Sequence, residues 1–124
     1  LVYVYEITLQ LYLMKTLRRS TLLYIDTSES ERTRVALEIE GKKFSFGERN
    51  EFLKAQALLP LIEKALKKQK LTVYDIGAIR VNPGPGSFTG LRVGVAVANT
   101  LGWVLGIPVN GKKVEKKPVE PIYI

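Results

Sequence analysis

Several residue types that commonly carry enzyme chemistry are absent from this chain of 124 residues. It has no cysteine and no histidine, which excludes a thiolate nucleophile, a Ser-His-Asp triad and a histidine-ligated metal within it. Lys and Arg total 19 against 12 Asp and Glu, giving a net charge of +7. Carboxylates, lysines, hydroxyls and main-chain groups therefore remain as the candidates for chemistry or binding.

A glycine-rich segment within residues 81–106 has the order of a binding loop. An apolar strand leads into a Gly-Pro turn and a helix start, an arrangement that can hold an anion on main-chain N–H groups. Its spacing fits no standard phosphate loop. A P-loop needs a Gly-Lys pair five residues after its first glycine, but Thr89 stands five residues after Gly84 and the segment has no lysine. In a dinucleotide-binding loop the third glycine would come at position 89, but here it comes one residue late, at Gly90. By spacing alone we favour a stiff turn in which Ser87 or Thr89 caps the next helix.

Asp26 ends the first predicted strand, within the sequence Asp-Thr-Ser. Its place resembles that of the metal-facing carboxylate in sugar-kinase and actin-like ATPases. Glu29 and Glu31 follow closely, and their charges would repel a nucleotide phosphate. We favour an Asp26 that bonds nearby main-chain donors, with a nucleotide-proximal role as the alternative.

The helix predicted after the loop has a small residue at every fourth position, namely Gly94, Ala98 and Gly102. A glycine inside a helix costs about 1 kcal/mol relative to alanine, so we expect a packing reason for this stripe. We interpret the stripe as the side that contacts a partner protein, with the chain's own sheet or first helix as the alternative. The apolar positions of the first helix would supply the adjoining surface, and these are Phe52, Ala55, Leu59, Ile62 and Leu66.

Hydrophobic periodicity predicts the elements that position these residues. Strands are expected at residues 22–28, 33–40, 43–48 and 77–82, and helices at about 51–69 and 91–106. The segment 107–110 could start one more strand. The order β-β-β-α-β-α indicates an α/β domain with a mixed sheet. The run Lys42 to Gly47 has the composition of an RNA-binding strand, but a plain hairpin strand is the favoured interpretation.

The two ends are expected to lie outside this domain, which we place at residues 20–111. Residues 1–19 form an N-terminal extension, in which positions 1–13 alternate like a strand. Met14 is the expected natural start, with an added edge strand as the alternative. The extension is too short to span a bilayer, and we expect no membrane association. Residues 112–124 are rich in lysine and proline and are expected to be a basic tail.

Three segments together resemble the TsaB family, also called YeaZ, of tRNA threonylcarbamoyladenosine biosynthesis proteins. They are LLYIDTS, AQALLPLIEKAL and DIGAIRVNPGPGSFTGLRVGVAVANTLGWVLGIPVNG, and they span about residues 22–111. The resemblance implies the RNase H-like fold of the actin/Hsp70-like superfamily. It is most specific in the family loop, which comprises Gly84, Pro85, Gly86, Ser87, Phe88, Thr89, Gly90 and Arg92.

The resemblance also implies a function. The chain would be a non-catalytic subunit that binds and supports a TsaD-like enzyme, with a TsaE-like ATPase, in transferring a threonylcarbamoyl group to the adenosine beside the tRNA anticodon. It would bind no metal or cofactor alone, with ATP or ADP and a metal present only in the partner complex. It would reach tRNA through the complex and work in the cytoplasm. Lys54 and Ala55 stand where many members have His-Ser. Typical members carry a second domain of similar size, and we expect this chain to be a short form that lacks most of it.

Two other classes of function stay open from the residues. The first is a small nucleotide-binding phosphotransferase of actin-like fold, against which the acidic Glu29 and Glu31 argue. The second is a self-associating interaction module that forms a homodimer through its glycine-striped helix.

Overall fold

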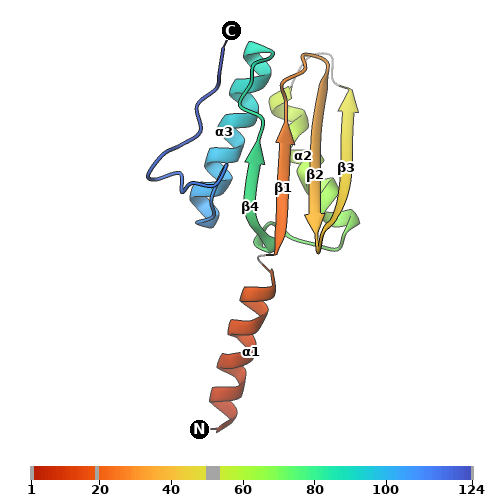
Figure 1. Ribbon diagram of the computed structural model, residues 1–124. Helices are drawn as coiled ribbons and strands as arrows, with labels where there is room; N and C mark the ends of the chain where they lie inside the picture. Colours follow the sequence, from red (N-terminus) through yellow and green to blue (C-terminus); the bar gives the residue numbers. More distant parts are fainter. Residues whose placement is uncertain (1, 19, 50–53, 124) are drawn as a thin grey trace.

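The computed structural model describes residues 2–18, 20–49 and 54–123 (Figure 1). Its elements are α1 (Val2–Arg18), β1 (Thr21–Asp26), β2 (Arg32–Ile39), β3 (Lys42–Arg49), α2 (Lys54–Lys68), the short 3-10 helix η1 (Val73–Asp75), β4 (Ile76–Val81) and α3 (Phe88–Leu105). The four strands and two helices predicted between residues 22 and 106 lie within a few residues of β1, β2, β3, β4, α2 and α3.

The four strands form one mixed sheet in the order β3-β2-β1-β4. β1 pairs antiparallel with β2 and parallel with β4, and β2 pairs antiparallel with β3. The β2–β3 hairpin turns at Glu40 and Gly41, which both have positive φ (51° and 82°) as a two-residue turn between twisted strands requires. The mixed α/β arrangement expected from the sequence is therefore confirmed.

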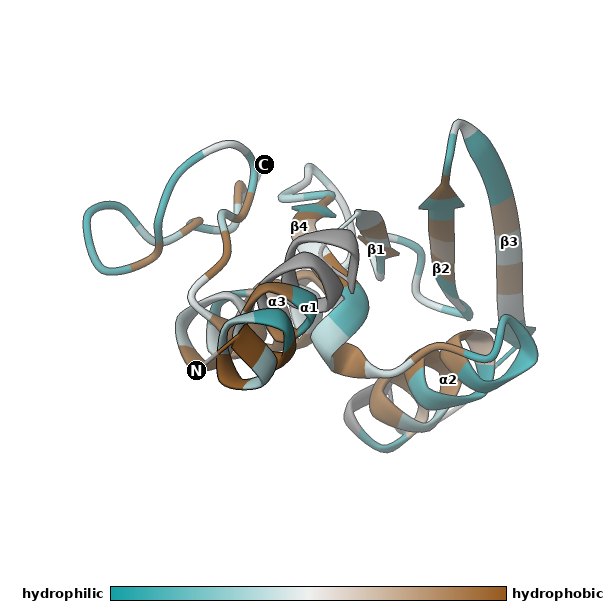
Figure 2. Cartoon of the chain, turned by 90° about the horizontal axis from the view of Figure 1, so that it is seen from below, coloured by the Kyte–Doolittle hydropathy of each residue, from teal (hydrophilic) through white to brown (hydrophobic). Residues whose placement is uncertain are grey.

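Helix α2, which follows β3, and helix α3, which follows β4, cover the same face of the sheet (Figure 2). α2 packs on β2 and β3, whereas α3 packs on β4 and β1 and also contacts α2. The core lies between these two layers and includes Leu23 and Ile25 of β1, Leu37 of β2 and Ile79 of β4, which are almost fully buried. The other face of the sheet carries the side chains of alternate, mostly polar residues.

α3 is the one helix of the described chain that is long and apolar enough to cross a membrane by length and composition. Its inner side contacts β1, β4 and α2, and Leu91, Val95 and Ala98 are buried there. Core helices of globular proteins pass the same test, and the contacts of α3 are those of such a helix.

The N-terminal segment differs from the expectation. Residues 2–18 form the helix α1, which extends away from the sheet (Figure 1), so the alternating strand is wrong. α1 contacts η1, and Val2, Tyr3, Val4 and Tyr5 are all exposed. Alternation of odd and even positions predicts a strand only when a neighbouring strand and a core select one face. Among the described residues, neither a neighbouring strand nor a core lies beside α1.

The C-terminal segment also differs, because it packs on the domain and is no free tail. Asn99 of α3 donates to Val119 O (2.9 Å) and accepts from Val119 N (3.0 Å). Ile122 N donates to Pro83 O at 2.7 Å, and Val114 and Val119 pack against the core. The strand expected from residue 107 is reduced to isolated bridges of Val109 with Ile79 and Lys112.

Candidate functional site

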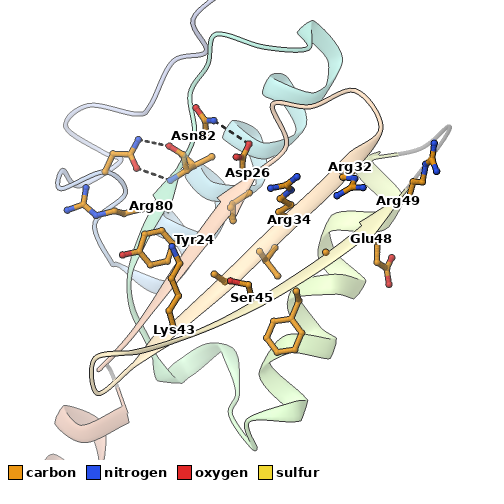
Figure 3. Close-up of a pocket in the computed structure, with 17 residues that line it drawn as sticks. Tyr24, Asp26, Arg32, Arg34, Lys43, Ser45, Glu48, Arg49, Arg80 and Asn82 are labelled. Atoms are coloured by element: carbon orange, nitrogen blue, oxygen red, sulfur yellow. Dashed lines mark hydrogen bonds between the residues drawn. The ribbon is translucent and has the colours of Figure 1, made fainter.

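A polar network joins the carboxyl ends of the parallel strands β1 and β4. Asp26 Oδ1 accepts hydrogen bonds from Ser28 N (2.9 Å), Ser28 Oγ (2.6 Å) and Asn82 Nδ2 (3.3 Å). Asn82 comes from the end of β4 and its Nδ2 also donates to Ser28 Oγ at 3.2 Å. Figure 3 shows the bond between Asn82 and Asp26 at the edge of the open sheet face. The network fixes the two strand ends together.

The electrostatics of Asp26 favour its ionised form. Partial burial raises the pKa of the carboxyl, but the hydrogen bonds from Ser28 and Asn82 and the charge of Arg34 outweigh it and lower the pKa below its usual value. One oxygen thus holds three donors. The favoured sequence interpretation of Asp26, bonding to nearby main-chain donors, agrees with Ser28 N. Among the described residues no group of three or more carboxylates could hold a metal ion.

The family loop is held by the same network. Asn82 Oδ1 accepts from Gly84 N at 3.0 Å, and Ser28 O accepts from Ser87 N at 2.7 Å. Ser87 is the N-cap of α3 and its Oγ accepts from Gly90 N at 3.3 Å, so the predicted capping turn is confirmed. The main-chain donors of Gly84, Ser87 and Gly90 are therefore used within the chain, which leaves them unable to form a phosphate cradle.

The remaining loop residues lie at the surface. Pro85, Gly86 and Thr89 are exposed. Phe88 is also exposed, although its ring lies 4.7 Å from that of Tyr123 and the guanidinium of Arg92 lies 5.4 Å from it. A glycine is required at position 86 because the main chain there passes close to Ser28, and a Cβ would collide with Ser28 O.

The small-residue stripe of α3 faces the inside of the fold. Ala98 is fully buried in the core, a Cβ on Gly94 would collide with the hydroxyl of Thr27, and one on Gly102 would collide with Val109. Thr27 Oγ1 donates to Gly90 O at 2.5 Å, which draws β1 and α3 together. The interpretation of the stripe as a partner-facing or self-pairing surface is therefore wrong, because the chain's own strand end and C-terminal segment fill it.

The apolar face expected of the first helix is also largely internal. Ile62 and Leu66 are buried against the sheet, which corrects their assignment to an interface. Leu59 is 51% exposed and stays a candidate. Phe52 and the side chain of Ala55 lie outside the described residues.

Large apolar side chains nevertheless lie at the outer surface of the two packed helices. Trp103 and Val104 of α3 are each 66% exposed, and Leu59 of α2 is 51% exposed. We define these three residues as the outer helix surface. Sequence reasoning missed Trp103 and Val104, although their signal was present: both are apolar residues out of phase with the small-residue stripe.

The open face of the sheet forms a broad hollow of about 810 Å³. The small residues Ala36, Ser45 and Gly47 are among those that line it, and Figure 3 shows charged side chains around Ser45. Lys43 lies 4.4 Å above the ring of Tyr24, and Arg34 pairs with Glu29 at 3.2 Å. Five of the side chains that line the hollow are basic and two are acidic, so positive charge predominates there; they are Arg32, Arg34, Lys43, Arg49 and Arg80 against Asp26 and Glu48.

Comparisons with known proteins bear on this arrangement. The family model described as "TsaD: tRNA N6-adenosine threonylcarbamoyltransferase" matches residues 53–111, which include α2, β4, the loop and α3. The tRNA threonylcarbamoyladenosine biosynthesis protein TsaB of Haemophilus influenzae is 37% identical over 89 residues, covering 72% of this chain and 37% of that protein. The structure of YeaZ from Pseudomonas aeruginosa superposes with a TM-score of 0.68 at 40% identity, covering 73% of this chain and 43% of that one.

The chain belongs to the TsaB/YeaZ family. The TsaB protein of Bacillus subtilis is also similar, at 40% identity over 52 residues, covering 42% of this chain and 23% of that protein. The chain spans less than half the length of these relatives.

Proposed function

We propose that this chain is a non-catalytic partner subunit in tRNA threonylcarbamoyladenosine biosynthesis, binding and supporting a TsaD-like enzyme. Family membership and the TsaB names of its relatives support the pathway. The match to the TsaD family and the likeness to YeaZ structures support an RNase H-like fold of the actin/Hsp70-like superfamily.

The observation that carries the binding role is the outer helix surface. Leu59, Trp103 and Val104 are large apolar side chains, more than half exposed, on the two helices that cover the sheet. Exposed tryptophan and aliphatic side chains of this kind are typical of the centre of a protein–protein interface, where burial of the indole contributes strongly to affinity. We therefore place the TsaD-like partner against α2 and α3, on the side opposite the small-residue stripe.

The polar network supports the non-catalytic role. Asp26 is engaged by Ser28 and Asn82, and the loop's main-chain donors bond within the chain. We propose that ATP or ADP and the metal are bound by the partner complex, with a TsaE-like ATPase, and that tRNA is reached through that complex in the cytoplasm.

The test is a binding and reconstitution experiment. Calorimetry of the chain with a TsaD-like protein should show saturable one-site binding. Adding the chain to TsaD-like and TsaE-like proteins with tRNA should raise threonylcarbamoyladenosine formation, while the chain alone forms none. No binding, or modification by the chain alone, would refute the proposal.

A further inference from the structure

The outer edge of β3 is the longest regular stretch of unpaired main chain in the described sheet. β3 is the terminal strand in the order β3-β2-β1-β4, and its eight residues pair with β2 without a bulge. Figure 1 shows no element of the described chain beyond it. Unpaired N–H and C=O groups along a straight edge are a template for another strand.

The hairpin determines which groups face outward. Ile39 and Lys42 flank the two-residue turn and form its closing, hydrogen-bonded pair. Hydrogen-bonded and non-bonded pairs alternate along an antiparallel ladder. Lys43, Ser45 and Gly47 therefore direct their main-chain N–H and C=O groups away from β2.

We propose that a second copy of this chain pairs with this edge, β3 against β3, in an antiparallel arrangement centred on Ser45. Ser45 then lies opposite Ser45 of the second copy, and Lys43 lies opposite Gly47, which gives about six new main-chain hydrogen bonds. The two sheets join into one continuous sheet related by a two-fold axis, so each contact occurs twice.

Side chains are complementary in this register. Lys42 lies opposite Glu48 of the second copy, and Phe44 lies opposite Phe46, so opposite charges and aromatic rings meet on the face that carries the helices. Such cross-strand pairs stabilise antiparallel sheets, whereas like charges directly opposite destabilise them.

Neighbouring registers lack this complementarity. If the pairing is centred on Phe46 instead of Ser45, Lys43 lies opposite Arg49 of the second copy, and both are positive. If it is centred on Phe44, Lys42 lies opposite the ring of Phe46. Lysines on an edge strand usually discourage pairing. Here Lys42 gains an opposite charge in only the register centred on Ser45.

Glu48 is available for this role. Its contact with Lys64 is 4.0 Å long and both side chains are largely exposed, so it contributes little to stability. The β3 edge is at the far side of the sheet from β4, on which α3 packs. The pairing therefore uses a surface separate from Trp103 and does not depend on the function proposed above.

A charge-exchange experiment tests the register. Lys42→Glu and Glu48→Lys, each in the full chain, should raise the dimer dissociation constant in sedimentation equilibrium by about tenfold or more, because each places two like-charged pairs across the axis. The double variant should recover the original dissociation constant. Lys113→Glu and Glu115→Lys, exposed in the C-terminal segment, are the matched controls and should dimerise as the unchanged chain does.

A cross-linking experiment tests the same axis independently. The chain has no cysteine, so Ser45→Cys introduces a single thiol whose Cα would lie about 5.5 Å from its copy, within disulfide range. Oxidation should link Ser45→Cys into dimers much faster than Thr100→Cys, an exposed control on α3. A monomer at all concentrations, an unchanged dissociation constant in both charge variants, or equal cross-linking of the two thiols would overturn the proposal.

Discussion

The two sides of α3 are both rich in small or apolar residues, yet they have different surroundings. On the inner side, Gly94, Ala98 and Gly102 are buried against Thr27, the core and Val109. On the outer side, Trp103 and Val104 are two-thirds exposed. A stripe of small residues shows that something approaches the helix closely, but it does not show whether that neighbour belongs to the same chain.

This difference separates stability from binding. A change on the inner side of α3 should lower the free energy of unfolding, because packed atoms there cannot move without disturbing the sheet. A change on the outer side should leave that free energy almost unaltered and act on partner affinity.

The largest effect on stability is expected for Ala98→Leu. Ala98 is fully buried, and overpacking a well-packed core costs about 1–3 kcal/mol of unfolding free energy. Ala96→Leu, on an exposed position of the same helix, should change it by less than about 0.5 kcal/mol. Urea unfolding of both variants measures the contrast, and equal stability of the two would show that the stripe does not face the core.

A smaller loss is expected for Thr27→Val. The substitution keeps the shape of the buried side chain but removes the hydrogen bond from Thr27 Oγ1 to Gly90 O, which should cost about 1 kcal/mol. The exposed Thr100, whose hydroxyl donates to Ala96 O at 2.8 Å, provides the control Thr100→Val, expected within about 0.5 kcal/mol of the unchanged chain. If Thr27→Val unfolds at the same urea concentration as the control, the link between β1 and α3 is not the one described.

The smallest effect concerns pH. The hydrogen bonds of Asp26 lower its pKa in the folded chain, so its contribution to stability is complete above the unfolded value of about 3.9 and is lost as pH falls through the folded value. Unfolding followed from neutral to acid pH should show a shallower acid-side loss of stability in Asp26→Asn than in the unchanged chain. Glu115→Gln is the exposed control. If Asp26→Asn lost as much unfolding free energy between neutral and acid pH as the unchanged chain, the network would not hold the charged carboxylate.

The sheet, the hairpin and the helices α2 and α3 followed from the sequence because each has a periodic apolar pattern that one face of a core selects. Leu23, Ile25 and Leu37 alternate with polar residues, and Ile62 and Leu66 recur at helical spacing. The pattern tells which residues are buried. On α2 and α3 it was over-interpreted where burial against the chain itself was taken for burial against a partner.

Other features depend on contacts between residues far apart in the chain. Asn82 reaches Asp26 across 56 positions, and Asn99 holds Val119 across 20, so local composition described residues 112–124 as a tail. For α1, no neighbouring strand in the described part of the chain selects an alternating face, and the segment is helical. Local patterns cannot report such pairings, because the bonded residues lie far apart in the sequence.

The most direct test of the binding face is the affinity of Trp103→Ala for a TsaD-like protein, measured by calorimetry. Truncating a tryptophan at the centre of an interface typically costs about 2 kcal/mol or more, or roughly 30-fold in affinity. Tyr74→Ala is the matched control, since Tyr74 is an equally exposed aromatic residue on η1. The account predicts that Trp103→Ala folds with unchanged stability and binds at least about 30-fold more weakly, while Tyr74→Ala binds normally. Full affinity in a folded Trp103→Ala variant would contradict it.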